Sequence, residues 1–320
     1  MRKTFISTLV ELATRDRRVL LLTGDLGYTV LEPFAQQFPD RFFNVGVAEQ
    51  NMVGLAAGLA DAGFLPFLYS IATFASLRPY EFLRNGAILP QLPVRVIAVG
   101  GGFEYGHAGS THHGLEDIGV MRLQPGLAAI APADYQQARS ALLATWDWPQ
   151  PVYYRLGKDD RNLVPDLDGR FAAGQVQCLG EGRDVLLVTM GSIAREVVAA
   201  AAALRAVGID STVAIAASLN PAPLEPLAQL LAQFPLAVSV EAHYITGGVG
   251  SLVAEVIAES GCGCRLRRCG VSRLPDGVSG SQDYLHTRYG LSKTQIITTV
   301  KTALQNSARQ SAAPSGGKPC

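Results

Sequence analysis

The chain has 320 residues, of which 48% are hydrophobic and 17% are charged. This length predicts about two domains, and the composition is sufficient for large buried cores. The 27 basic and 27 acidic residues give a formal net charge of zero. Because no basic block stands out, the sequence argues against electrostatic binding to nucleic acid or to a membrane surface.

The N-terminal segment MRKTFISTLVELATRD has apolar residues at helical spacing and also carries Glu11 and Asp16. It predicts an amphipathic helix and is not typical of a signal peptide. No apolar run reaches the roughly 18 residues that span a bilayer. We therefore expect a cytoplasmic protein.

Five cysteines are too few, and odd in number, for a disulfide scaffold. Cys262, Cys264 and Cys269 form a cluster, but no fourth ligand lies nearby and the spacing is not that of paired zinc ligands. A turn that leads into a strand is the favoured interpretation of this cluster, and no metal site is predicted in this chain.

The first half of the chain alternates helices with short apolar runs. Such runs indicate strands that are buried on both faces, as in a parallel sheet covered by helices. The predicted strands cover 19–22, 42–45, 65–70, 94–99 and 152–155. The predicted helices cover 4–15, 32–38, 49–61, 78–89 and 134–145.

A second alternating unit follows a polar segment. Its predicted strands cover 184–189, 210–216, 236–240 and 265–269, and its predicted helices cover 193–206, 224–233, 251–259 and 292–305. The fold class is therefore α/β, with two doubly wound parallel-sheet domains. The domains cover 1–160 and 184–305, joined by a linker over 161–183 and followed by a disordered tail over 306–320.

The helix over 49–61 begins with one carboxylate, Glu49, and continues with small residues such as Gly54 and Gly58. A helix N-terminus favours negative charge, so Glu49 has a purely structural interpretation. A buried carboxylate also needs a specific partner. The alternative is that Glu49 forms a hydrogen bond with a ligand held in a crevice.

A long loop over 100–123 is rich in glycine and contains His107, His112 and His113. Loops beyond the carboxyl ends of parallel strands commonly bind ligands. Imidazoles there suit proton transfer or hydrogen bonds to hydroxyl groups. A polar surface loop and a metal site are the alternatives, and the metal site is less favoured because the side chains of neighbouring histidines diverge.

Three other features have a structural and a functional interpretation. Phe74 and Tyr80 could stack on a planar ring or be ordinary core aromatics. Asp25 follows a buried strand, and a turn-forming role is favoured for it. The glycine-rich segment 247–251 joins a strand to a helix, where a tight turn is favoured over an anion site.

These segments, taken in chain order, resemble the transketolase family and its relatives, the 1-deoxyxylulose-5-phosphate synthases and the β-subunits of 2-oxo acid dehydrogenases. The segment VGVAEQNMVGLAAGLA is similar to the family's cofactor-activating segment. The other motifs are GDLG, ATFAS, GSTHHGLED, PVYYRLGK and EAHYITGGVGS. The resemblance covers about residues 2–303 and implies a pyrimidine-binding domain followed by a transketolase C-terminal domain.

The resemblance implies thiamine diphosphate as the cofactor. It makes Glu49 the glutamate that hydrogen-bonds N1′ of the aminopyrimidine and Phe74 the aromatic residue that stacks on it. Tyr80, Asp25 and Leu26 are the other cofactor contacts that it implies.

The same resemblance makes His112 a catalytic residue that contacts the hydroxyl groups of the substrate. It also places His113, Arg155, Thr29 and Arg2 where the family binds substrate phosphate or distal hydroxyls.

Two departures from the family pattern are visible. Gly100 and Ala108 stand where typical transketolases have a histidine and an aspartate that contact the sugar, so the substrate is expected to differ from a standard pentose phosphate. The Gly-Asp-Gly metal motif of the diphosphate-binding domain is also absent, since Gly24-Asp25 is followed by Leu26. We therefore expect a partner chain to hold Mg²⁺ (or Ca²⁺) and the diphosphate.

The resulting hypothesis is the C-terminal subunit of a two-component transketolase, active only with its N-terminal partner in an α2β2 heterotetramer. It would transfer a two-carbon ketol unit from a ketose phosphate to an aldose, and the sequence does not identify the sugars. The alternatives are an enzyme like 1-deoxyxylulose-5-phosphate synthase, a 2-oxo acid dehydrogenase β-subunit, or a non-catalytic scaffolding subunit.

Overall fold

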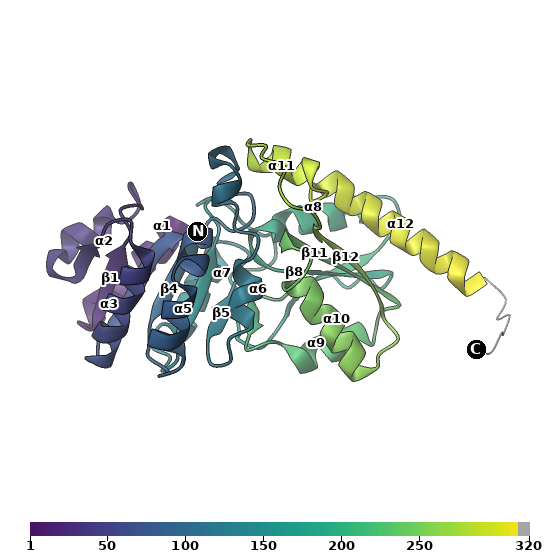
Figure 1. Cartoon of the computed structure of the whole chain (residues 1–320). Helices are drawn as coiled ribbons and strands as arrows, with labels where there is room; N and C mark the ends of the chain where they lie inside the picture. Colours follow the sequence, from purple (N-terminus) through teal and green to yellow (C-terminus); the bar gives the residue numbers. More distant parts are fainter. Residues whose placement is uncertain (313–320) are drawn as a thin grey trace.

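The computed structural model describes residues 1–312, with side chains up to residue 306. Two α/β domains lie side by side, one from the first half of the chain and one from the second (Figure 1). The predicted fold class is confirmed, because each domain is a sheet of mainly parallel strands flanked by helices.

The first sheet has seven strands in the order β10-β5-β6-β4-β3-β1-β2. All neighbours are parallel except β10, which pairs antiparallel with β5. The strands are β1 (Val19–Thr23), β2 (Phe42–Asn44), β3 (Leu65–Ile71), β4 (Arg95–Val99), β5 (Ala128–Ile130), β6 (Val152–Leu156) and β10 (Ser218–Asn220). The second half of the chain thus supplies the edge strand of the first sheet.

Alternate residues of the first strands face opposite cores. In β1, Leu20 and Leu22 belong to one buried cluster, and Val19 and Leu21 belong to another on the opposite face. Since successive side chains of a strand point to opposite faces, this pattern is the physical reason that the strand reads as a continuous apolar run.

Helices cover both faces of the first sheet. On one face, residues of α1 (Arg2–Arg15), α2 (Glu32–Gln37) and α7 (Tyr135–Thr145) share a core with the strands. The other face is covered by α3 (Glu49–Asp61), α4 (Ala72–Leu77), α5 (Tyr80–Leu83) and α6 (Asp117–Arg122). This second core continues without a break into the neighbouring domain, where Leu227 and Leu252 belong to it.

The second sheet has five strands in the order β12-β11-β8-β9-β7. They are β7 (Gln177–Leu179), β8 (Val185–Thr189), β9 (Ser211–Ile215), β11 (Leu236–Tyr244) and β12 (Arg265–Val271). The helices of this domain are α8 (Ala194–Arg205), α9 (Leu224–Leu231), α10 (Val249–Ser260), α11 (Gln282–Arg288) and α12 (Lys293–Ala312). Figure 1 shows α12 along the outer side of this domain.

The segment 161–183 is packed against both domains, although the sequence predicts a polar linker there. Val164 and Leu167 are buried. The strand β7 lies within this segment and pairs antiparallel with β9. The linker prediction misses these contacts because a three-residue strand has no detectable periodicity.

Among the predicted helices, those over 78–89 and 292–305 differ most from the structure. The helix over 78–89 is α5 followed by a π-helical turn, Arg84–Ile88. The last helix spans Lys293–Ala312 and so continues past the predicted end at residue 305. Pro314 is the first helix-breaking residue in this stretch of the sequence, and the remainder of the predicted tail lies outside the described residues.

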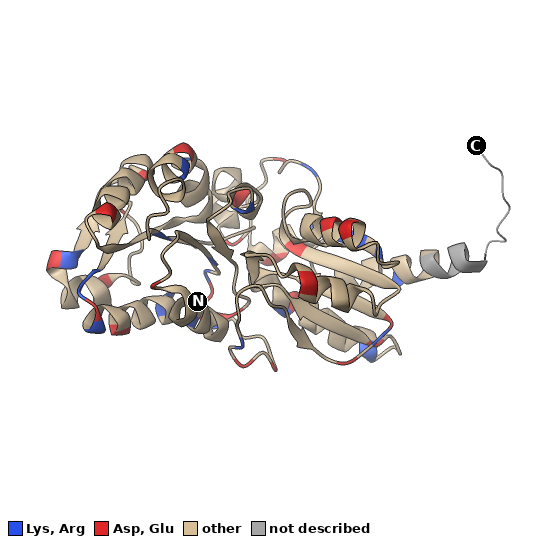
Figure 2. Cartoon of the chain, turned by 90° about the horizontal axis from the view of Figure 1, so that it is seen from below, with Lys and Arg blue, Asp and Glu red and all other residues tan. Residues whose placement is uncertain are grey.

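Acidic and basic residues are interspersed over both domains (Figure 2). None of the helices in the described part of the chain has the length and apolar character needed to cross a membrane. Cys262 and Cys264 precede β12 and Cys269 lies within it. Burial raises the pKa of the thiols of Cys264 and Cys269 to about 11, so both are protonated at neutral pH.

The side chain of Asp134 connects the start of α7 to the segment after β6, so its loss should destabilise the fold. Its Oδ1 accepts a hydrogen bond of 2.7 Å from the N–H of Gln137, and Oδ2 accepts one of 3.0 Å from the N–H of Val164. We expect Asp134→Ala to lower the free energy of unfolding by about 2 kcal/mol, since a helix cap and a buried acceptor are lost. Urea unfolding measures this loss.

Asp147→Ala is the matched control for that variant. Asp147 is exposed, and its substitution should change the free energy of unfolding by less than about 0.5 kcal/mol. Equal stability of the two variants would contradict the role assigned to Asp134.

Candidate active site

Glu49 lies at the carboxyl edge of the first sheet, just beyond β2. The chain leaves β2 at Asn44, turns at Gly46 with a φ of 73°, and begins α3 at Glu49. Glycine adopts a positive φ without steric cost, so it permits this turn. The N-terminus of α3 then stabilises the negative charge of Glu49.

The carboxylate of Glu49 is buried and has a donor on each oxygen. Its side chain is 1% exposed. The hydroxyl of Ser70 donates to Oε1 at 3.0 Å, and Nη1 of Arg78 donates to Oε2 at 2.8 Å. These two contacts offset the cost of removing the carboxylate from water.

An aromatic cluster adjoins this carboxylate. The guanidinium carbon of Arg78 lies 3.9 Å from the ring centroid of Phe74. The ring of His112 meets Phe74 edge to face, with 5.0 Å between the centroids. The structure therefore brings Glu49, Phe74 and His112 into one site, where Arg78 contacts both Glu49 and Phe74.

A cavity of about 670 Å³ adjoins Glu49. Besides Glu49 it is lined by Val47, Ala48, Gln50, Asn51 and Arg78. Val47 is 70% exposed, so the cavity has an apolar side chain at the surface and a carboxylate behind it. A flat heteroaromatic ring with a hydrogen-bonding nitrogen fits these groups, and the aminopyrimidine of thiamine diphosphate is such a ring.

The loop after β1 lies at the same edge of the sheet. The backbone N–H of Asp25 donates to Oδ1 of Asn44 at 3.1 Å, and Nδ2 of Asn44 donates to Oδ1 of Asp25 at 2.9 Å. The Asn44 amide holds the pKa of Asp25 below its ordinary value. Leu26 is half-buried and Thr29 is exposed on this loop. Their contacts with cofactor and substrate stay predictions.

Tyr80 connects two helices in this structure. Its hydroxyl donates to the carbonyl of Val120 at 3.1 Å. It also accepts a hydrogen bond from the amide of Gln124. Both contacts tie α5 to the end of α6, and a stacking contact with the cofactor stays a prediction.

The neighbouring histidines of the glycine-rich loop point to different environments. His112 packs on Phe74, and its Nδ1 lies 3.0 Å from the hydroxyl of Thr111. His113 is 3% exposed and packs edge to face on Phe103. Burial lowers the pKa of His113. The structure thus places His112 beside the site and His113 in the core, and the substrate contacts of both stay predictions.

Arg155 is buried at the junction of the two domains. Its side chain is 4% exposed, and Nε donates to Oδ2 of Asp117 at 2.8 Å. Its Nη2 donates to the carbonyls of Gly114 and Ala242, at 2.9 Å each. The guanidinium therefore holds the glycine-rich loop to β11. This structural role is sufficient to explain an arginine at position 155. A contact between Arg155 and the substrate stays a prediction.

His243, also at the junction, is a residue that the sequence did not single out. Its Nε2 accepts a hydrogen bond of 3.1 Å from the N–H of Gly119, so the ring proton is on Nδ1. Nδ1 then donates to the carbonyl of Tyr244 at 2.7 Å. Burial lowers the pKa of His243, which keeps this neutral form. The only indication of this role in the sequence was the position of His243 within the motif EAHYITGGVGS.

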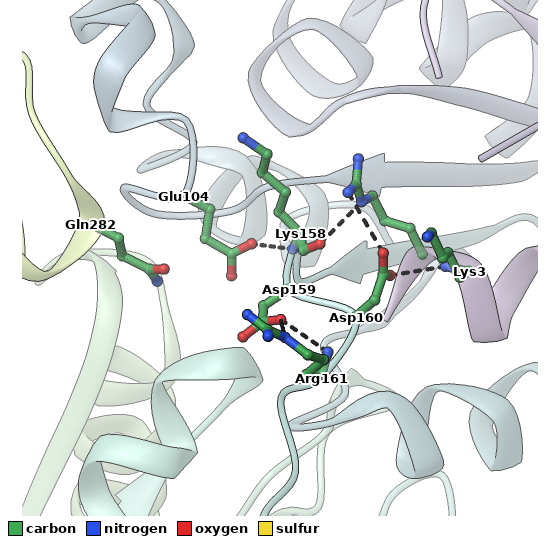
Figure 3. Close-up of a pocket in the computed structure, with 8 residues that line it drawn as sticks. Lys3, Glu104, Lys158, Asp159, Asp160, Arg161 and Gln282 are labelled. Atoms are coloured by element: carbon green, nitrogen blue, oxygen red, sulfur yellow. Dashed lines mark hydrogen bonds and ion pairs between the residues drawn. The ribbon is translucent and has the colours of Figure 1, made fainter. Parts of the chain in front are cut away.

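Arg2 lines a separate cavity of about 440 Å³. Its Nε donates to the carbonyl of Lys158 at 3.0 Å, and Nη2 lies 3.6 Å from Asp160. Basic and acidic side chains both line this cavity, and Gln282 of α11 lies on its far side (Figure 3). The cavity lies between the domains, and a phosphate contact of Arg2 stays a prediction.

Ser70 and Arg78 also contact Glu49 and were not predicted. Ser70 is near the end of β3 and Arg78 follows α4. Both flank the motif ATFAS in the sequence, which was the available signal. Neither could be assigned to Glu49 from sequence, because a hydrogen bond across 21 or 29 residues depends on the sheet order.

A carboxylate, an aromatic ring and a histidine thus meet at the end of a parallel sheet. Residues 1–162 match the family model "Transketolase, pyrimidine binding domain", and residues 174–296 match "Transketolase, C-terminal domain". The chain belongs to the transketolase family.

Two relatives and a solved structure agree with this assignment. The chain is 34% identical to one subunit of the apulose-4-phosphate transketolase of Phocaeicola vulgatus, over 95% of this chain and 96% of that protein. It is also 34% identical to 1-deoxy-D-xylulose-5-phosphate synthase of Desulfitobacterium hafniense (strain Y51), of which it covers 47%. A structure described as a split gene transketolase, an inactive beta4 tetramer, matches with a TM-score of 0.83 and 34% identity, over 95% of this chain and 97% of that one.

Because Arg155 is buried, replacing it should also lower the stability of the chain. Arg155→Met leaves the carboxylate of Asp117 buried without its cation, so the free energy of unfolding should fall by about 3–5 kcal/mol. Thermal unfolding monitored by circular dichroism measures the change.

The control for Arg155→Met is Arg139→Met. Arg139 pairs with Glu11, and both side chains are more than 40% exposed, so this variant should lose at most about 1 kcal/mol. If Arg155→Met unfolds like the wild type, the guanidinium does not hold the junction.

Proposed function

We propose that the chain is the C-terminal subunit of a two-component, thiamine-diphosphate-dependent transketolase. It transfers a two-carbon ketol unit from a ketose to an aldose acceptor. The observation that carries the proposal is the buried carboxylate of Glu49, at a helix N-terminus, beside an open cavity and in one cluster with Phe74. A scaffolding subunit has no need for a costly buried charge in that position.

The relatives support a second subunit in the active enzyme. The chain covers nearly the whole of a protein named as one subunit of a transketolase, and only 47% of a 1-deoxy-D-xylulose-5-phosphate synthase. No Gly-Asp-Gly motif occurs in this sequence. The diphosphate and its Mg²⁺ (or Ca²⁺) are accordingly assigned to an N-terminal partner chain, in an α2β2 assembly with the cofactor shared between chains.

Each residue of the site has a distinct chemical task. Thiamine diphosphate, when bound, supplies the nucleophilic carbon that takes up the ketol unit. Glu49 holds the proton that it shares with N1′ of the pyrimidine, and the buried position prevents water from competing for this contact. Phe74 fixes the plane of the ring by stacking. His112, which packs on Phe74, donates or accepts hydrogen bonds at the sugar hydroxyls.

The surroundings of Gly100 are evidence that the substrate is a sugar other than a standard pentose phosphate. At Gly100, where typical transketolases have a histidine, φ is +79° and a Cβ atom would lie 2.2 Å from the ring of Tyr105. The ring of Tyr105 therefore fills the space that a side chain at this position would need. The histidine contact with the sugar is lost, and a different acceptor or donor is expected.

Glu49→Gln tests the proposed mechanism. Glutamine keeps the size of the side chain but cannot carry the shared proton, so kcat should fall by about 10²–10⁴-fold. The assay is ketol transfer from a ketose phosphate to an aldose, with the partner chain, thiamine diphosphate and Mg²⁺ present.

Glu225→Gln is the control, because Glu225 also lies in the first turn of a helix but is exposed. Its activity should equal that of the wild type. A Glu49→Gln enzyme with full activity would disprove the assigned role of Glu49.

The second test compares the chain alone with the two-chain mixture. We expect no turnover by the chain alone, and this expectation is supported by a structural relative described as an inactive beta4 tetramer. Turnover without a partner would refute the shared site.

Pyruvate with glyceraldehyde 3-phosphate serves as the alternative substrate pair. Activity with this pair and none with ketose donors would favour the synthase reaction, which the relative at 34% identity makes the second candidate.

A further inference from the structure

Arg78 occupies an unusual position for a surface arginine. Its side chain is 44% exposed, yet its guanidinium reaches the carboxylate of Glu49, which is 1% exposed. The same guanidinium lies over the ring of Phe74, with 3.9 Å from its central carbon to the ring centroid. One flat group thus satisfies the buried acid and covers the aromatic face at the same time.

These two contacts are the ones that an aminopyrimidine ring would make. Guanidinium is planar, stacks on aromatic faces and donates hydrogen bonds to carboxylates. An aminopyrimidine that hydrogen-bonds Glu49 and stacks on Phe74 has the same shape and needs the same two surfaces. The two groups cannot both occupy Oε2 of Glu49 and the face of Phe74 at once.

We propose that Arg78 is a placeholder for the pyrimidine ring: it neutralises Glu49 in the subunit without cofactor and is displaced from Glu49 and Phe74 when the ring enters. The proposal rests on the proposed function, since it takes thiamine diphosphate as the ligand. It assigns Arg78 a positioning role through Glu49.

The chain around Arg78 permits such a movement. Arg78 directly follows the last residue of α4, and Pro79 separates it from α5. Its side chain already faces solvent over nearly half of its surface, so it can leave Glu49 without rearrangement of a buried element. Ser70 keeps its hydrogen bond to the other oxygen, Oε1, which holds the carboxylate in place during the exchange.

The placeholder protects the subunit before assembly. Without a cation, Glu49 would be a buried charge with one hydroxyl donor, which is costly. With Arg78 in place the charge of Glu49 is compensated in the isolated chain, and the pair must be broken before the cofactor binds. Removing Arg78 should therefore weaken the empty subunit and strengthen cofactor binding, whereas a simple cofactor ligand would weaken binding when removed.

The test measures the dissociation constant of thiamine diphosphate for the two-chain complex, by calorimetry with Mg²⁺ present. We expect Arg78→Met to bind about 3–5-fold more tightly than the wild type, because a partly exposed ion pair no longer has to be broken. Arg78→Lys retains the charge without the planar group and should lie between the two. Arg17→Met is the control, since Arg17 is exposed on the turn before β1, and it should leave the dissociation constant unchanged.

A second measurement covers the case in which Arg78→Met fails to fold. Modification of arginine by phenylglyoxal, mapped by mass spectrometry on the wild-type complex, should label Arg78 faster with thiamine diphosphate than without it. Weaker or unchanged cofactor binding by Arg78→Met, or slower labelling of Arg78 with cofactor, would overturn the placeholder. If the wild-type complex binds no thiamine diphosphate, the proposed function fails together with this inference; binding that Arg78→Met does not strengthen refutes the inference alone.

Discussion

The buried ion pair between Arg155 and Asp117 is the interaction on which the arrangement of the two domains depends. Its guanidinium joins β6, the start of α6, the glycine-rich loop and β11 through one set of hydrogen bonds. The hydroxyl of Tyr153 also donates to Asp117 at 3.0 Å. Through the hydrogen bonds to Gly114 and Ala242, the loop that carries His112 is fixed relative to the second domain.

Two glycines of the loop are required by the close packing around this ion pair. A Cβ atom at Gly101 would lie 2.4 Å from the guanidinium of Arg155, and one at Gly102 would lie 2.8 Å from Ala242. The loop can pass between the two domains only where it has no side chains. The glycine-rich composition of the loop therefore reflects close packing, and His113, which is 3% exposed, lies on the inner side of the same loop.

The sequence was sufficient for the fold class because its strands are buried on both faces, which produces continuous apolar runs such as Val19–Thr23. It was insufficient for β7 and β10, which are short edge strands whose partners lie far away in the chain. Glu49, Phe74 and His112 could be brought together only through resemblance to a family. The burial of Arg155 could not be foreseen, because its partner Asp117 is 38 residues away and reads as the start of a helix.

The same reasoning explains why Glu49 and Arg78 are a different kind of pair from Asp117 and Arg155. At the junction both partners are buried, so separating them would leave two charges out of water, and the pair is permanent. At the cofactor site only the carboxylate is buried. Arg78 regains water when it leaves, and only the carboxylate then needs a new partner, which the entering ring supplies. A site that must exchange one occupant for another needs this asymmetry: the acid stays fixed at the N-terminus of α3 while its cation can leave.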